Sequence, residues 1–277
     1  MKKAVLTAHS DYERYDLASK NYDSYRIPAG LKTLIGTLST SGIPINEMHI
    51  ISMGCGTGNY EIELALRTKK VCGVDISPEM ISKAKEKSRR ILNIEFFIDD
   101  AVNMKMFTSE AFDAALFILS LHHFGDYKKQ SQALEESYRL LNKGGLIIIQ
   151  TLSQRQIRDG FWFYDLIPEA ANRLATKYIP IPDLINILKK IGFEYKERIP
   201  IDAVLQGKSY LNYNGIFRKE WRDGNSIWSL ATENELKNAQ LKIIEMKKNG
   251  TINEYIKKRE ELREDTGQIT YVYSVKK

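Results

Sequence analysis

Apolar runs and amphipathic stretches alternate along most of the chain. Apolar runs that predict strands occupy residues 49–53, 71–74, 93–98, 112–120, 146–150, 193–199 and 268–275. Amphipathic stretches that predict helices occupy residues 30–40, 61–66, 126–141, 182–190 and 232–249. The run at 112–120 is almost uninterrupted, which is typical of a strand that is covered on both faces.

One of these strand ends is rich in glycine. Gly54, Gly56 and Gly58 follow the strand at residues 49–53 and precede a helix. Glycine permits backbone conformations that are closed to other residues and lets a ligand approach the main chain. A dinucleotide-binding turn has the spacing G-x-G-x-x-G, but Asn59 stands where its last glycine would fall. The turn therefore predicts a nucleotide-like ligand, and its spacing disfavours a dinucleotide.

Residues 53–58, Met-Gly-Cys-Gly-Thr-Gly, resemble the first motif of the class I S-adenosylmethionine (SAM)-dependent methyltransferases, in particular the small-molecule type 11/25-like enzymes. The resemblance implies an α/β fold: a Rossmann-like, seven-stranded, doubly wound sheet of six parallel strands and one antiparallel strand. It also implies that SAM lies on the turn, which consists of Gly54, Cys55, Gly56, Thr57 and Gly58. The family usually carries an acid just before this turn, where this chain has Ser52 and Met53.

Asp75 ends the second predicted strand. A carboxylate at this position can accept both hydroxyls of a ribose whose nucleoside lies across the glycine turn. Alternatively, Asp75 supplies negative charge to the N-terminus of the helix that Ser77 and Pro78 open. Residues 75–80 also resemble the second motif of the family, which implies that Ile76 and Met80 line the adenosine site.

Acidic residues also close the third predicted strand. In the family an acid at this strand end receives the adenine amino group; Asp100 with Ala101 aligns best, and Asp99 is one step off. The alternative is a pair of solvated turn acids. The resemblance also places Phe117 and Ile118, near the end of the fourth strand, among the cofactor-binding residues.

Two adjacent histidines follow the fourth strand. His122 and His123 stand where parallel sheets bind ligands, at the carboxyl end of a strand. We predict no metal, because no carboxylate or thiol stands nearby at a spacing that would complete a site. In the family such a motif shapes the cofactor pocket or caps the next helix. As a catalytic alternative, either imidazole could act as a general base, since imidazole exchanges protons near neutral pH.

The segment before the first strand is rich in tyrosine. Residues 22–26 match an element of small-molecule methyltransferases that folds over the cofactor, which implies cofactor contacts for Tyr25 and Arg26 and a substrate contact for Tyr22. An aromatic face is attracted to a sulfonium cation. The alternative is a helix that packs its aromatic residues on the edge of the sheet.

The remaining stretches divide the chain into parts. We expect an N-terminal helical cover at 1–45, a SAM-binding core at 46–201 with a lid at 152–180, an inserted helical cap at 202–267 and a final strand at 268–277. The lid and the insertion are aromatic and should overhang the strand ends. Predicted acceptor contacts are Arg158, Trp162, Tyr210 and Trp228. These aromatic residues could equally form an ordinary core of the inserted helices.

Composition narrows the possible partners. The 277 residues carry a formal charge of +6, but basic residues stand next to acids, as in residues 259–265, which favours a solvated helical face over a nucleic-acid surface. Cys55 and Cys72 give neither a disulfide framework nor metal-ligand spacing. No apolar run is long enough to cross a membrane, and the first residues do not read as a signal peptide. We expect a cytoplasmic monomer or homodimer.

The predicted activity is transfer of the SAM methyl group to an O, N, S or C nucleophile of a small, largely buried metabolite by in-line displacement. The protein's main task in such a reaction is to hold the nucleophile near the methyl in a water-poor pocket. Three alternatives stay open: a SAM-binding module without turnover, an RNA or protein methyltransferase, and an NAD-dependent oxidoreductase, which the glycine spacing disfavours.

Overall fold

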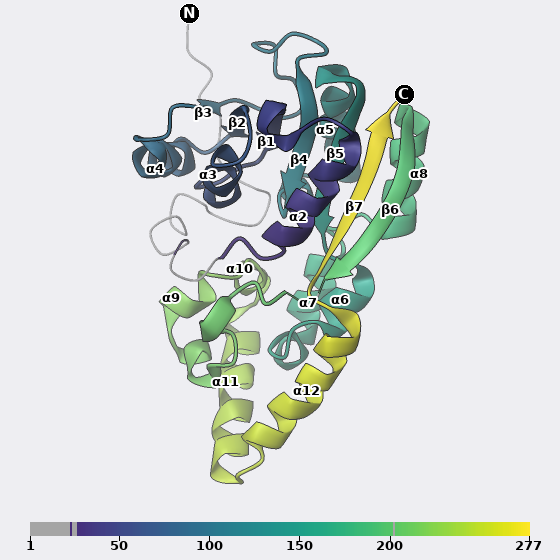
Figure 1. The fold of residues 1–277 in the computed structure, drawn as a ribbon. Coiled ribbons are helices and arrows are strands. Elements are labelled where there is room, and N and C mark those ends of the chain that lie inside the picture. The colour runs from purple at the N-terminus through teal and green to yellow at the C-terminus, as the bar shows by residue number, and fades with distance from the viewer. Residues whose placement is uncertain (1–22, 24–26, 202) are drawn as a thin grey trace, which may run out of the picture.

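A seven-stranded sheet forms the centre of the computed structural model, which describes residue 23 and residues 27–201 and 203–277 (Figure 1). Its strands are β1 (His49–Met53), β2 (Lys70–Asp75), β3 (Ile94–Ile98), β4 (Phe112–Ile118), β5 (Leu141–Thr151), β6 (Phe193–Ile201) and β7 (Ile269–Lys276), in the order β3-β2-β1-β4-β5-β7-β6. Strand β7 is antiparallel to both of its neighbours, and the other pairs are parallel. The predicted fold class is confirmed. Tyr22, Tyr25 and Arg26 lie outside the described residues.

Helices cover both faces of the sheet. They are α2 (Leu31–Leu38), α3 (Asn59–Ala65), α4 (Pro78–Ser88), α5 (Tyr127–Leu140) and α8 (Ile181–Ile191). Helices α2, α3 and α4 share a buried cluster with Ile50 of β1, whereas α5 and α8 share another with the adjacent Ile51. Successive strand residues point to opposite faces, so a run of apolar residues serves both layers.

A glycine pair, Gly144 and Gly145, lies near the start of the fifth strand. Helix α5 ends at Leu140, and β5 begins at the next residue. Gly144 lies inside β5 with φ of 77°, where the register between β4 and β5 shifts. Glycine accommodates this strand irregularity without steric cost, so the pair belongs to the strand and does not cap the helix.

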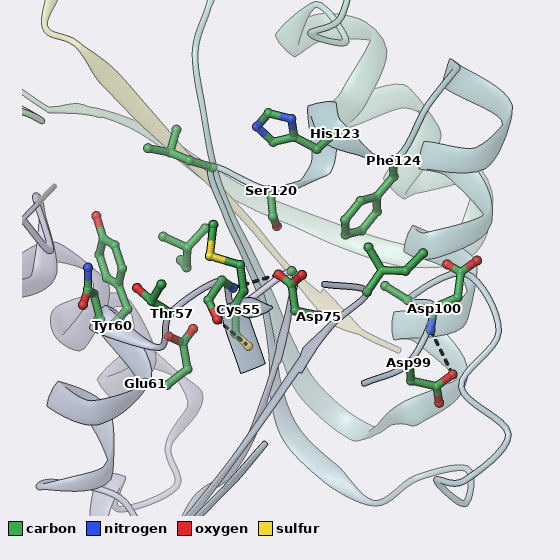
Figure 2. A pocket seen from close by; sticks show the side chains of 18 of the residues that line it. Cys55, Thr57, Tyr60, Glu61, Asp75, Asp99, Asp100, Ser120, His123 and Phe124 are labelled. Carbon is green, nitrogen blue, oxygen red and sulfur yellow. Dashed lines mark hydrogen bonds between the residues drawn. The ribbon is translucent and has the colours of Figure 1, made fainter. Parts of the chain in front are cut away.

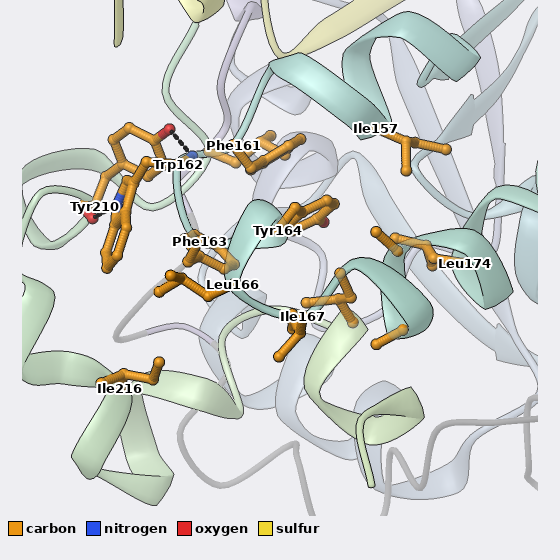
Figure 3. Packing of buried hydrophobic residues seen from close by; sticks show 14 of the residues in the cluster. Ile157, Phe161, Trp162, Phe163, Tyr164, Leu166, Ile167, Leu174, Tyr210 and Ile216 are labelled. Carbon is orange, nitrogen blue, oxygen red and sulfur yellow. Dashed lines mark hydrogen bonds between the residues drawn. The ribbon is translucent and has the colours of Figure 1, made fainter. Parts of the chain in front are cut away.

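A second body of helices, which we call the cap, lies beyond the carboxyl ends of the parallel strands (Figure 1). It consists of residues 152–178 and 203–267, with α6 (Gln154–Asp159), α7 (Pro168–Ala175), α9 (Lys219–Arg222), α10 (Ile227–Leu230), α11 (Glu233–Lys248) and α12 (Ile252–Thr266). Thr232 and Glu235 form a capping box at the start of α11. The cap has its own buried aromatic cluster, shown in Figure 3.

Candidate active site

A cavity opens where β1, β2, β3 and β4 end (Figure 2). Its wall includes the glycine turn, the acids that follow β2 and β3, and the segment after β4. The lining residues are Ile27, Gly54, Cys55, Gly56, Thr57, Asn59, Tyr60, Glu61, Asp75, Ile76, Met80, Asp99, Asp100, Ala101, Val102, Ile118, Leu119, Ser120, His123, Phe124, Gly125, Lys129 and Leu205. Ten of the predicted SAM-binding residues thus line one cavity, whereas Gly58 and Phe117 do not.

The glycine turn brings the main chain to the cavity surface. Gly54 has φ of 77°, and a Cβ there would lie 2.5 Å from the Cβ of Ser120, so the turn requires glycine at this position. Gly56 has φ of 54°, and a Cβ there would meet nothing within 4 Å, so its main chain faces open space. Gly58 precedes α3, packs against Phe96 and lies outside the lining set. Two of the three glycines therefore face the ligand space.

Asp75 is held with its carboxylate at the turn. One oxygen, Oδ2, accepts from the Gly56 N–H at 2.8 Å, and Oδ1 accepts from the Ser77 N–H at 2.9 Å. Burial raises the pKa of Asp75, while these backbone donors oppose the rise. Each carboxylate oxygen has a further lone pair that these two bonds do not use. The carboxylate can therefore accept a hydrogen bond from each hydroxyl of a vicinal diol in the cavity.

The adenine end of the predicted site is also assembled. Asp99 and Asp100 line the cavity, together with the apolar side chains of Ile76, Met80 and Ala101. Asp100 Oδ1 accepts from the Val102 N–H at 3.1 Å, and Asp99 Oδ1 accepts from the Asp100 N–H at 2.8 Å. These bonds orient both carboxylates at the end of β3. A flat ring would thus have apolar neighbours and an acidic edge.

Phe117 and Ile118 separate in the structure. Ile118 lines the cavity, whereas Phe117 is fully buried in the sheet core and lies outside the lining set. Neighbouring strand residues point to opposite sides, which explains the difference. The ring of Phe117 packs edge-on against Phe124 at 6.0 Å between centroids. Phe117 therefore supports a lining residue and does not take the predicted cofactor-binding position.

The two histidines also separate. His123, the last residue of a 3₁₀ turn at Leu121–His123, lines the cavity. His122 is buried outside the lining set, where its Nε2 shares a hydrogen bond of 2.9 Å with the Tyr178 hydroxyl and its ring stacks on Tyr178 at 4.0 Å. The structure thus gives His122 a packing position and leaves His123 as the histidine that faces the ligand space.

The predicted acceptor contacts in the cap do not line this cavity. Trp162 and Tyr210 are buried in the cap core, where Trp162 Nε1 donates to the Tyr210 carbonyl at 2.8 Å (Figure 3). Trp228 stacks on Phe163 at 5.6 Å, and Arg158 is exposed and paired with Asp159. None of the four side chains lines the cavity, so we correct the predicted contacts: three aromatic residues pack in the cap and Arg158 lies at the surface.

The described part of the N-terminal segment contacts the turn through Asp23. Its carboxylate accepts from the Thr57 hydroxyl at 2.5 Å, from Asn59 Nδ2 at 3.0 Å and from Lys87 Nζ at 2.9 Å. Burial opposes ionisation, yet these partners leave the pKa of Asp23 below its ordinary value. Thr57, a predicted SAM-binding residue, is thereby tied to the segment that precedes the core.

Glu61 is the lining residue that sequence reasoning missed most clearly. Its side chain is 1% exposed, and the Ser52 hydroxyl donates to Glu61 Oε1 at 2.5 Å. Burial raises its pKa to about 7, against the opposing effects of the Ser52 hydrogen bond, of the residue's own backbone N–H and of Lys87. An acid in the first turn of a helix is usually read as a surface residue, so the pattern alone carried no signal of burial.

Several other lining residues carried only a weak signal. Leu119 has φ of 49°, an unusual value for leucine, and directly follows the last residue of β4. Tyr60 donates its hydroxyl to the Ala29 carbonyl at 2.8 Å, and Ser120 donates to the Met53 carbonyl at 2.6 Å. Their proximity to the predicted strand ends could have indicated them, whereas Ile27 and Leu205 approach from distant segments.

Across residues 27–201 and 203–277 together with residue 23, no group of three or more histidine, cysteine or acidic side chains is placed to hold a metal ion. Within the same residues, no helix combines the length and the apolar character that a membrane crossing needs.

Comparisons with known proteins place this arrangement among related sequences. A family model described as a methyltransferase domain matches residues 51–149. An uncharacterized methyltransferase of Bacillus cytotoxicus is 30% identical over 161 residues, which make up 52% of this chain and 69% of that protein. A tRNA (carboxymethyluridine(34)-5-O)-methyltransferase of Xenopus tropicalis is 33% identical over 109 residues, 39% of this chain and 16% of that protein. The family match covers the glycine turn and the acids at the ends of β2 and β3.

The likeness to a solved structure extends further along the chain. A crystal structure of an Anabaena variabilis protein, described as a candidate methyltransferase from an antibiotic biosynthesis pathway, covers 91% of this chain and 99% of its own. The TM-score is 0.70 at 22% sequence identity. At this identity the likeness shows a shared fold, and the covered share takes in most of the cap as well as the core.

Proposed function

The chain belongs to the class I S-adenosylmethionine-dependent methyltransferases, and from this premise we propose that it methylates a small metabolite enclosed between the glycine turn and the cap. The acceptor atom is an O, N, S or C nucleophile. The observation that carries the proposal is the roof of the cavity, since Leu205 of the cap and Ile27 of the N-terminal segment both line it. A cavity bordered by the core and by two distant segments suits a small ligand better than a polymer.

The roof is anchored by hydrogen bonds. The Ile27 N–H donates to the Leu205 carbonyl at 3.4 Å, and the Leu205 N–H donates to Gln268 Oε1 at 2.9 Å. Gln268 directly precedes β7, so the cap edge is tied to the sheet at this point. Two segments from distant parts of the chain thus meet at the wall of the cavity.

The residues of the cavity fit SAM. Gly56 leaves open space at the turn, Asp75 presents acceptors for a ribose, and Ile76, Met80 and Ala101 offer an apolar surface to adenine. When bound, SAM supplies a methyl group on a sulfonium whose departure leaves a neutral thioether. The chain's task is then to position the acceptor and to exclude water.

His123 takes the part of proton acceptor in this proposal. Its imidazole lines the cavity, and imidazole exchanges protons near neutral pH. An oxygen or nitrogen nucleophile that carries a proton would release it to His123 as the new bond forms. His122 holds the turn that presents His123, through its contact with Tyr178.

One comparison supports a small acceptor, and another points to a nucleic acid. The Anabaena protein, described as part of an antibiotic pathway, shares the fold over 91% of this chain, which takes in most of the cap. The tRNA enzyme of Xenopus tropicalis matches 39% of this chain, too little to take in both the core and the whole cap. A nucleic-acid acceptor is therefore the weaker alternative.

The test combines binding with turnover. Purified protein is titrated with SAM, with S-adenosylhomocysteine and with NAD, and is then incubated with SAM and pooled small metabolites, with transfer RNA in a separate reaction. The proposal expects binding of SAM and of its product but not of NAD, and a mass increase of one methylene in a small metabolite. SAM binding without turnover on either pool would support a module, and methylated tRNA would support a polymer acceptor.

A further inference from the structure

Glu61 is a buried acid whose hydrogen bonds are incomplete. One oxygen, Oε1, accepts from the Ser52 hydroxyl at 2.5 Å. The other, Oε2, is buried and has no hydrogen-bond partner among the described residues. A buried carboxylate oxygen without a partner is costly, because it has lost water and gained nothing in exchange. Glu61 lines the cavity, so a ligand is the available source of a donor.

The cations around Glu61 do not fill this need. Lys87 of α4 is close enough to affect Glu61 electrostatically, but its Nζ bonds to Asp23, Thr57 and Asn59. The other ionisable groups that interact with Glu61 are Asp75 and the thiol of Cys55, neither of which is a cation. Within the described part of the chain, no salt bridge of Glu61 is formed.

The position of Glu61 along the cavity suggests which part of a ligand it meets. Strands β3, β2 and β1 lie side by side, with Asp99 and Asp100 at the end of β3 and Asp75 at the end of β2. Glu61 comes next in this order, through its bond to Ser52 on β1, and Figure 2 shows the same succession. A nucleoside whose base lies at β3 and whose ribose lies at Asp75 would extend its 5′ substituent toward Glu61.

We propose that Glu61 binds the ammonium group of the amino-acid end of SAM through Oε2. The inference rests on the proposed function, since it concerns the donor of that reaction. An ammonium offers three N–H donors and a positive charge, which match a buried carboxylate that lacks both. Ser52, which stands where the family usually has an acid, then serves to orient the acid that α3 supplies.

The proposal predicts a pH dependence of SAM affinity. Burial raises the pKa of Glu61 to about 7, and a bound ammonium favours the ionised form, so binding releases a proton from molecules in which Glu61 is protonated. Affinity should therefore weaken as the pH falls through neutrality. Asp75, Cys55 and Lys87 also face Glu61, so the Glu61→Gln variant is needed to assign the effect: its SAM affinity should lose the pH dependence.

The decisive experiment uses ligands that differ at the ammonium. Wild type and Glu61→Gln are titrated with SAM, with decarboxylated SAM, which retains the ammonium, and with methylthioadenosine, which lacks it. We expect Glu61→Gln to bind the first two roughly 10- to 100-fold more weakly, as for loss of a hydrogen bond between charged groups, and methylthioadenosine unchanged. Glu63→Gln, on an exposed face of the same helix, should leave all three affinities unchanged.

A double variant and a stability measurement test whether Glu61 acts through the position of its acid or through the stability of the fold. Ser52→Asp/Glu61→Gln returns the acid to β1 and should recover most of the SAM affinity. Ligand-free Glu61→Gln should unfold no more easily than wild type near neutral pH, because it removes a desolvated charge. Equal weakening for methylthioadenosine, or unchanged SAM affinity, would overturn the role of Glu61 alone. Failure of wild type to bind SAM would overturn the proposed function with it.

Discussion

The core and the cap both border the cavity, but they use their polar groups differently. At the strand ends, Asp75 and His123 face the ligand space. In the cap, two of the buried polar contacts lie within the cap and away from the cavity: Trp162 Nε1 donates to the Tyr210 carbonyl at 2.8 Å, and the Tyr164 hydroxyl donates to Asn225 Oδ1 at 3.0 Å. The cap contributes the apolar side chain of Leu205 to the cavity.

This difference separates two tasks. Directional polar groups on short turns after rigid strands select a ligand by its hydrogen-bonding pattern, whereas an apolar roof selects by shape and excludes water. Changes in the cap core should therefore reduce stability first and donor binding only as a consequence. Changes at the strand ends should reduce binding or turnover in a protein that is still folded. The following variants test this separation.

The largest expected effect is that of Trp162→Ala in the cap. The variant loses a fully buried indole and its bond to Tyr210, so the free energy of unfolding should fall by about 3–5 kcal/mol. Chemical denaturation measures the change, and Leu241→Ala, at a position 53% exposed on α11, is the control that should stay within about 0.5 kcal/mol. Weaker SAM binding with unchanged stability would instead make Trp162 a binding residue.

His123→Asn probes the opposite behaviour at the strand ends. Loss of a general base should lower the turnover rate by roughly 10²- to 10⁴-fold, while SAM affinity and the unfolding midpoint stay close to wild type. His122→Asn is the matched variant and should lower the unfolding midpoint, because it leaves the Tyr178 hydroxyl without this partner. Equal turnover in wild type and His123→Asn would remove His123 from the chemistry.

Tyr178→Phe gives the smallest of these effects. It removes the hydroxyl that meets His122 Nε2 at 2.9 Å but keeps the stacked ring, so the free energy of unfolding should fall by about 1 kcal/mol. SAM affinity should not change, since Tyr178 does not line the cavity. A loss of affinity as large as the loss of stability would show that the packing behind His123 also shapes the donor site.

Sequence patterns predicted that several strand-end residues lie side by side, for a physical reason. Asp75 ends one apolar strand and Asp100 lies two residues beyond another. The carboxyl ends of parallel strands meet at one edge of a sheet, so their proximity follows from spacing alone. The same rule could not separate His122 from His123, because adjacent residues differ only in the direction of their side chains.

Other features depend on partners that are distant in the sequence. Glu61 and Glu63 look alike in a helix start, and burial beside Ser52 distinguishes the first. Trp162 is an aromatic residue in the predicted lid. Its side chain points into the cap core, where it contacts Tyr210, 48 residues away. Similarly, the register shift that places Gly144 inside β5 requires knowledge of how β4 pairs.

The most direct test of the central claim is calorimetric titration of Asp75→Asn with SAM. Asp75 accepts from the turn and the following helix start, and its remaining acceptor capacity is assigned to the ribose. We predict a loss of about 2–4 kcal/mol in binding free energy, as for two charge-assisted hydrogen bonds, with Asp183→Asn on the exposed side of α8 unchanged. An Asp75→Asn protein that binds SAM as tightly as wild type would contradict the assignment of the donor site.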